Sequence, residues 1–211
     1  MPLKTLVVDD HQAARVGLIS LFEGSSIEVT ETAADGEEAL QKLESGQIDV
    51  ALIDVQMKKM DGLSLLSSIR QAIPDLPVVL ISAYDYPVYI ARAVANGAQE
   101  YVLKSDPIAG IEAAIRHAVE HREVRPGGRL DSIRRKMSEP LSADVPELPV
   151  TSREGQVLRH VAFGLSNREI ATSLGISVET VKEHVQNILR KTGASDRTDV
   201  AVRAVRLGIV D

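Results

Sequence analysis

Short apolar runs that alternate with helix patterns limit the possible fold of this chain more than any other feature of its sequence. Four runs read as buried strands, at residues 6–8, 50–53, 78–81 and 101–103, and a weaker strand is expected at residues 27–30. Helix patterns follow the five strands in turn, at residues 11–23, 36–45, 62–73, 87–96 and 107–121. This alternation predicts a five-stranded, doubly wound parallel sheet with helices on both faces.

Polar side chains follow four of the predicted strands. They are two adjacent carboxylates, a third carboxylate, a hydroxyl and an ammonium: Asp9 and Asp10, Asp54, Ser82, and Lys104. Parallel strands end at one edge of the sheet, where such folds bind ligands. Three carboxylates at one edge would repel one another unless a hard cation lay between them, and Mg²⁺ is the natural candidate. The hydroxyl and the ammonium are the groups that a phosphoryl group on Asp54 would need around it.

This pattern resembles a two-component receiver domain, over residues 1–123 and with a flavodoxin-like α/β fold. The resemblance implies phosphorylation at Asp54, switch and phosphate contacts at Ser82, Tyr101 and Lys104, and metal ligation by Asp9, Asp10, Asp54 and Gln56. Each residue also has a simpler explanation, such as a helix cap for Asp9 and Asp10, core packing for Tyr101 or a surface charge for Lys104. Their joint placement favours the receiver.

The match to receivers has departures. Lys58 stands where most receivers have proline, and Ser82 replaces the commoner threonine but keeps the hydroxyl. Glu100 occupies a place where glycine is common, directly before Tyr101. We expect Glu100 to add a charge near the switch surface.

Charge is divided unevenly along the chain. Lys and Arg number 10 against 19 Asp and Glu in residues 1–123, 5 against 4 in residues 124–150, and 9 against 7 in residues 151–211. The mildly basic C-terminal part permits a surface that faces nucleic-acid phosphates. The absence of cysteine excludes disulfides and thiol catalysis, and the absence of a long apolar run predicts a cytoplasmic chain with no membrane partner.

Residues 124–150 read as a linker, because four prolines and a pair of glycines interrupt them. A short helix could form at residues 130–137, but the prolines and mixed charge argue against a packed core. The basic cluster at residues 134–136 could touch DNA or the acidic receiver, and a solvated face is the preferred interpretation.

From Thr151 the pattern is purely helical. Two capping boxes, at residues 151–154 and 166–169, open two helices, and Gly175 and Ser177 then form a turn and a cap before a third. This is helix-turn-helix spacing. Along the third helix the apolar positions take the inner face, which leaves an outer face of Glu179, Lys182, Glu183, Gln186 and Arg190.

Residues 151–211 resemble the LuxR-type DNA-binding domain, through the stretches at 152–154, 164–171 and 180–185. The resemblance implies an all-α domain that contacts DNA through Lys182, Glu183, Gln186, Thr180 and Arg190, and that dimerises through a final helix at residues 199–207.

Together the two parts resemble a NarL/FixJ-type response regulator. Such a protein is a transcription factor rather than an enzyme. It uses Mg²⁺, accepts a phosphoryl group from a sensor histidine kinase, forms a homodimer on activation and binds double-stranded DNA. Two alternatives stay open: a phosphatase or phosphotransferase that uses the same aspartate chemistry, which the helix-turn-helix disfavours, and a regulator that answers to a protein partner instead of phosphorylation.

Overall fold

The N-terminal domain is built on a single parallel sheet. The computed structural model describes residues 1–45, 47–139 and 148–210. The strands run in the order β2-β1-β3-β4-β5, and all neighbours are parallel. Their bounds are β1 (Leu3–Val8), β2 (Ile27–Ala33), β3 (Val50–Asp54), β4 (Val78–Ser82) and β5 (Glu100–Leu103). The predicted doubly wound fold is confirmed, and the carboxyl ends of its strands form one edge.

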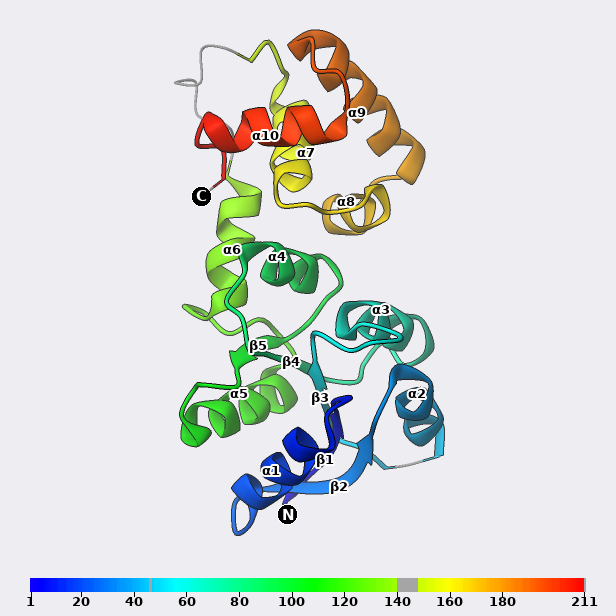
Figure 1. The fold of residues 1–211 in the computed structure, drawn as a ribbon, viewed down its shortest axis with the longest axis vertical. Coiled ribbons are helices and arrows are strands. Elements are labelled where there is room, and N and C mark those ends of the chain that lie inside the picture. Colours follow the sequence, from blue (N-terminus) through cyan, green and yellow to red (C-terminus); the bar gives the residue numbers. More distant parts are fainter. Residues whose placement is uncertain (46, 140–147, 211) are drawn as a thin grey trace.

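Helices cover both faces of this sheet (Figure 1). One face packs against α1 (Gln12–Phe22) and α5 (Ile108–His121), and the other against α2 (Gly36–Ser45), α3 (Gly62–Ala72) and α4 (Pro87–Ala95). Alternate strand residues point to opposite faces. Because both faces are covered, the fully buried strands β3 and β4 and the buried end of β1 appear in the sequence as apolar runs.

The second strand is longer than predicted. β2 continues beyond residue 30, and Glu31, Thr32 and Ala33 pair with the end of β1. It is an edge strand with several exposed residues, so its polar positions hide the apolar signal on which the prediction relied.

The expectation that residues 124–150 lack a packed core is wrong for their middle. Helix α6 (Arg129–Ser138) buries Leu130, Ile133 and Met137 against the receiver and α7. These residues share one face of the helix, and the neighbouring prolines lie outside it. Arg134 and Arg135 of the basic cluster both pair with Asp131, at 2.8 and 2.6 Å. The cluster therefore pairs in part within its own helix.

The C-terminal domain has four described helices, α7 (Ser152–Ala162), α8 (Asn167–Leu174), α9 (Val178–Thr192) and α10 (Arg197–Arg206). Both predicted capping boxes are present, because Thr151 and Ser166 each exchange hydrogen bonds with the glutamate three residues later. Gly175 ends α8 in the left-handed conformation, which allows the tight turn into α9. Among the described residues, every helix is too short or too polar to cross a membrane.

Candidate phosphoacceptor pocket and DNA-reading helix

Lys104 joins two carboxylates at the carboxyl edge of the sheet. Its ammonium nitrogen lies 2.6 Å from Asp9 Oδ2 and 2.9 Å from Asp54 Oδ1. Asp9 is fully buried and Asp54 nearly so, since each follows a strand that is covered on both faces. The strand ends thus place two carboxylates and a cation together, as the sequence predicted.

Burial and ion pairing shift the pKa values of two groups in this pocket, Asp54 and Lys104. Burial raises the pKa of the Asp54 carboxyl, and the hydrogen bond from Lys104 only partly offsets this effect. Burial alone would lower the pKa of Lys104, but its hydrogen bonds to Asp9 and Asp54 raise it. Lys104 therefore stays charged at neutral pH and compensates carboxylates that would otherwise be costly to bury.

Asp9, Asp10 and His11 form the candidate metal site. Their possible ligand atoms all lie within 4.8 Å of one another. The Oδ1 atom of Asp10 is buried and makes no hydrogen bond within the described part of the chain, although His11 Nδ1 is 2.7 Å away. A buried carboxylate oxygen that has an exposed imidazole as its neighbour suits a hard cation. His11 was not predicted, although its place directly after Asp10 is visible in the sequence.

Gln56, another predicted metal ligand, makes a side-chain contact with α4. Its side chain is exposed, and its amide nitrogen donates to the Tyr89 hydroxyl at 3.0 Å. The start of α3 is hydrogen-bonded to the backbone next to Asp54, because Gly62 N donates to Val55 O at 3.0 Å. A Cβ atom on Gly62 would overlap the carbonyl oxygen of Asp54, so glycine is required at this position beside Asp54.

Ser82 and Tyr101 both contact the backbone of Tyr84, in the loop between β4 and α4. Ser82 Oγ accepts from Tyr84 N at 3.1 Å, and the Tyr101 hydroxyl donates to Tyr84 O at 2.9 Å. The Tyr101 ring is buried. Burial raises the pKa of the Tyr101 phenol, which therefore stays a neutral donor. A movement of the Tyr84 backbone would therefore affect the hydrogen bonds of both Ser82 and Tyr101.

Glu100 does not add a charge to the surface, contrary to expectation. It is only 1% exposed, and Arg125 Nε lies 2.9 Å from its Oε1 atom. Burial raises the pKa of Glu100, and Arg125 opposes this. The carboxylate faces the chain that leads into α6, so its partner comes from the segment that was read as linker.

The predicted outer face of α9 is solvent-exposed. Lys182, Glu183, Gln186 and Arg190 are all exposed, whereas Val181 and Ile188 on the opposite side are buried. Thr180 is half-buried in the first turn of the helix, where its backbone nitrogen donates to the capping Ser177 Oγ at 3.0 Å. Figure 1 shows α9 on the side of the domain away from the sheet.

The two domains meet through α4 and α8, which face each other in Figure 1. Arg92 Nε and Asn96 Nδ2 donate to Glu169 Oε1, at 2.7 and 3.2 Å. The other oxygen, Oε2, accepts from Ser166 N at 2.7 Å and completes the capping box. Burial alone would raise the pKa of Glu169, but the bonds from Ser166 and Arg92 lower it. Sequence reasoning found the cap and missed the second role of this carboxylate.

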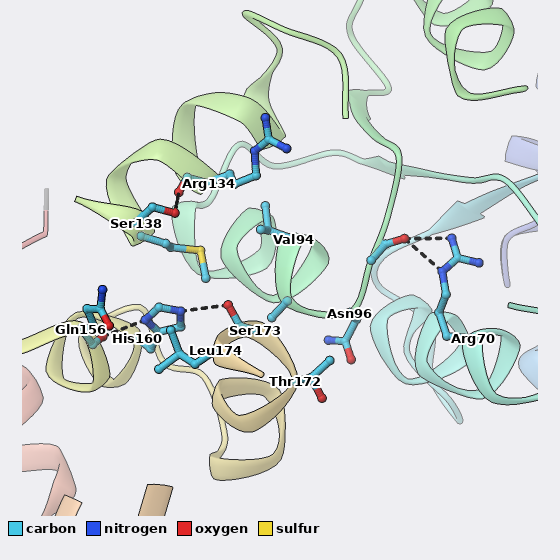
Figure 2. Close-up of a pocket in the computed structure, with 13 residues that line it drawn as sticks. Arg70, Val94, Asn96, Arg134, Ser138, Gln156, His160, Thr172, Ser173 and Leu174 are labelled. Carbon is cyan, nitrogen blue, oxygen red and sulfur yellow. Dashed lines mark hydrogen bonds between the residues drawn. The ribbon is translucent and has the colours of Figure 1, made fainter. Parts of the chain in front are cut away.

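A cavity of about 580 Å³ lies beside this contact, between α4, α6, α7 and α8 (Figure 2). His160 is buried in its wall, with Nδ1 2.8 Å from Gln156 O and Nε2 2.9 Å from Ser173 Oγ. Burial lowers the pKa of His160 and keeps the imidazole neutral. Arg70, at one end, donates to the Gly97 carbonyl. These polar groups support the seam between the domains, away from the Asp54 pocket.

Comparisons with known proteins agree with this arrangement. The family model for response regulator receiver domains matches residues 5–116, and the model for bacterial regulatory proteins of the luxR family matches residues 148–204. The chain is a response regulator. It carries a receiver domain and a LuxR-type DNA-binding domain, and its family is one of transcription regulators rather than a known class of enzymes. Receiver domains generally bind Mg²⁺ at an acidic cluster of the kind that Asp9 and Asp10 form here.

This response regulator resembles several others along its whole length. The response regulator protein VraR of Staphylococcus saprophyticus and that of Staphylococcus aureus are each 33% identical over 211 residues, which covers 100% of both chains. The crystal structure of ChrA, from a heme-sensing two-component system, is 31% identical with a TM-score of 0.53, over 99% of both chains. A structure of RcsB with DNA is 18% identical with a TM-score of 0.57, covering 99% of this chain and 100% of RcsB, and it supports the fold alone.

Proposed function

We propose that this response regulator is switched by phosphorylation of Asp54. The observation that carries the proposal is the Lys104 ammonium held between Asp54 and the buried Asp9. An Asp54 oxygen would attack the phosphorus of a phosphohistidine on a sensor kinase, forming the O–P bond as the N–P bond breaks. Lys104 would neutralise charge on the phosphoryl oxygens and Ser82 would donate to one of them. Bound Mg²⁺ would supply further neutralisation of that charge.

Magnesium would be held by Asp9 and Asp10, with Asp54 and Gln56 as the remaining predicted ligands. The buried Asp10 Oδ1 atom supports this set, because a small hard cation takes carboxylate oxygens and keeps several waters. His11 would be released from Asp10 or would remain as an outer partner of that carboxylate.

Changing Asp10 to alanine should weaken Mg²⁺ binding by at least about tenfold, in line with the loss of one charged ligand. Isothermal titration of the whole chain with MgCl₂ measures this. Glu37→Ala, which removes an acid from the first turn of α2, serves as the control and should bind Mg²⁺ as the wild type does. An unchanged affinity in Asp10→Ala would place the metal elsewhere.

Phosphorylation would act on DNA binding through the seam between α4 and α8. Both Ser82 and Tyr101 contact the loop that leads into α4, and α4 carries Arg92 and Asn96 to Glu169. In a helix-turn-helix the first helix crosses the DNA backbone, so a receiver seated on the N-terminus of α8 would hinder this approach while leaving α9 exposed. A shift of α4 would release α8.

Replacing Arg92 with alanine should raise the DNA affinity of the unphosphorylated chain about fivefold, the lower end of ordinary coupling between sites. The α8 cap should survive, because Glu169 keeps its bonds to Ser166. Fluorescence anisotropy with a labelled duplex measures the change. Lys42→Ala, which breaks a pair with Glu38 inside α2, is the matched control and should leave DNA affinity as it is. Equal affinity in Arg92→Ala and wild type would mean that the seam does not restrain the DNA-binding domain.

The DNA contacts are proposed for Lys182, Glu183, Gln186, Thr180 and Arg190 of α9. Dimerisation is proposed through α10, where Val202 and Val205 are 43% and 50% exposed on one face. A two-fold dimer would read two half-sites. The boundaries of the receiver (1–123), linker (124–150) and DNA-binding domain (151–211), and a cytoplasmic location, complete the proposal.

The experiment that tests the function is footprinting of genomic fragments with the whole chain, before and after treatment with acetyl phosphate and Mg²⁺. We expect protected sites that appear or strengthen after treatment. The same footprints before and after would favour a regulator that answers to a protein partner, and the absence of footprints together with rapid release of phosphate would favour the phosphatase alternative.

A further inference from the structure

Arg129 bonds to two loops that border the phosphoacceptor pocket. It is the first residue of α6, and its side chain is 31% exposed. Its Nη1 and Nη2 atoms donate to the two oxygens of Asp106, at 2.7 and 3.0 Å. Its Nε atom lies 3.4 Å from Asp85 Oδ2. Asp85 belongs to the loop between β4 and α4, and Asp106 to the loop between β5 and α5, so one guanidinium spans both loops.

These loops carry the residues proposed to respond to the phosphoryl group. Tyr84, which contacts both Ser82 and Tyr101, directly precedes Asp85. Asp106 is two residues from Lys104, and its Oδ2 atom also accepts from Leu103 N at 2.9 Å. A shift of Ser82 or Lys104 toward Asp54 would therefore move a carboxylate that Arg129 holds.

The contact to Asp106 has the geometry of a specific pair. Two parallel N–H donors meet two carboxylate oxygens, an arrangement that guanidinium forms and ammonium cannot. Burial alone would raise the pKa of Asp106, but its hydrogen bonds from Arg129 and Leu103 lower it. The carboxylate is therefore ionised and paired at neutral pH.

The far end of α6 is tied to the DNA-binding domain. Arg159 of α7 is buried, and its Nη1 atom donates to the carbonyl oxygens of Lys136 and Glu139, at 2.7 and 2.5 Å. A cation at the C-terminal carbonyls of a helix is favourable, because these groups have no partner within the helix. Helix α6 thus contacts the pocket loops at one end and α7 at the other, as its course in Figure 1 shows.

We propose that Arg129 is a positioning residue that couples the two pocket loops to α6 and holds the DNA-binding domain on the receiver until Asp54 is phosphorylated. The inference rests on the proposed function for the role of Asp54. Phosphorylation draws Ser82 and Lys104 inward, the loops turn Asp85 and Asp106 away from Arg129, and α6 loosens together with α7. This route uses contacts other than the one that Arg92 makes, although α6 also packs against α4.

The test measures the affinity of the whole chain for a labelled duplex before and after treatment with acetyl phosphate and Mg²⁺. In Arg129→Ala the untreated chain should bind about fivefold more tightly than the wild type, and the ratio between treated and untreated affinities should fall by the same factor. Arg129→Lys keeps the charge without the bidentate contact. Its untreated affinity and its ratio should lie between those of the wild type and Arg129→Ala. Arg135→Ala, which loses only a pair with Asp131 inside α6, should keep the wild-type ratio.

Other outcomes separate the two proposals. If the wild type responds to treatment and Arg129→Ala responds with the same ratio, Arg129 makes an ordinary surface ion pair and the coupling role is overturned. If the wild type does not respond, the DNA affinity of the double variant Asp54→Asn, Arg129→Ala is compared with that of Asp54→Asn alone. Tighter binding by the double variant supports the role of Arg129 and overturns only the phosphorylation switch. Equal binding overturns both proposals. Should Arg129→Ala unfold, the double variant Asp85→Asn and Asp106→Asn removes the contact from the receiver side, with the same expected change in ratio.

Discussion

Asp54→Asn should abolish phosphorylation of the whole chain by acetyl phosphate and Mg²⁺, whereas the wild type should gain one phosphoryl group. The amide cannot act as the nucleophile that the carboxylate supplies, and no second acid stands at the end of β3. Intact-mass measurement over a time course reports the labelling directly. We expect no labelled fraction in the variant after the wild type has reached its plateau.

Loss of labelling must be distinguished from loss of fold. Burial raises the pKa of Asp54, so its charge is unfavourable in the folded chain. The folded state therefore binds a proton more readily than the unfolded chain, and the stability from this group is present at low pH and is lost as pH rises through the raised pKa. A neutral asparagine should then leave the free energy of unfolding at pH 7 unchanged or higher.

The control for this experiment is Asp61→Asn. Asp61 caps α3, where its Oδ1 atom accepts from Ser64 N at 2.6 Å, and asparagine caps a helix about as well. This variant removes a carboxylate near the acceptor without touching the strand end, so it should be labelled as the wild type is. Labelling of Asp54→Asn at the wild-type level would show that the acceptor is another residue.

The residues at the strand ends could be predicted because two simple rules act there. Buried parallel strands appear as unbroken apolar runs, and the carboxyl ends of such strands share one edge. Asp9, Asp54 and Lys104 were therefore expected to lie together, and the distances to Lys104 confirm this. The capping boxes of α7 and α8 were equally visible, because each requires only a hydroxyl and a glutamate three residues apart.

The contacts between the domains could not be predicted in the same way. Glu169 reads as a helix cap in the sequence, and nothing local shows that its second oxygen meets Arg92. Helix α6 has an apolar face of ordinary spacing, but the surface that buries this face lies in another part of the chain. Glu100 has the same character, since its partner Arg125 lies beyond α5 in the sequence but contacts it in the fold. Such pairs depend on tertiary placement rather than on local pattern.

Gln186→Ala should change which sequences the chain prefers, and Lys182→Ala should change how tightly it binds to all of them. Both side chains are exposed on the outer face of α9. A glutamine amide can bond two atoms of adenine, and each good contact of this kind is worth about 1–3 kcal/mol of discrimination, or roughly 5- to 150-fold. Its loss should relax preference at one base pair in each half-site and leave non-specific binding nearly intact.

The lysine should behave differently if it faces a phosphate. Lys182 lies 3.4 Å from Glu179, a weak exposed pair that it can leave for DNA. Each phosphate contact contributes about 0.9 to the slope of log affinity against log salt, so Lys182→Ala should reduce that slope by about one and weaken all sequences alike. Glu179→Ala is the control, and it should strengthen binding to all sequences. The change frees Lys182 from its pair and removes a negative charge from this face.

Binding of the three variants and the wild type to a randomised-site library, at two salt concentrations, separates these effects. A relaxed base preference in Gln186→Ala with an unchanged salt slope assigns base reading to that residue. A smaller salt slope with unchanged base preference in Lys182→Ala means that Lys182 contacts a phosphate. A changed base preference would mean that it contacts guanine. If both variants kept the wild-type preference and the wild-type slope, α9 would not be the helix that enters the groove, and the exposed face of α8 beyond the Glu169 contact would have to take that role.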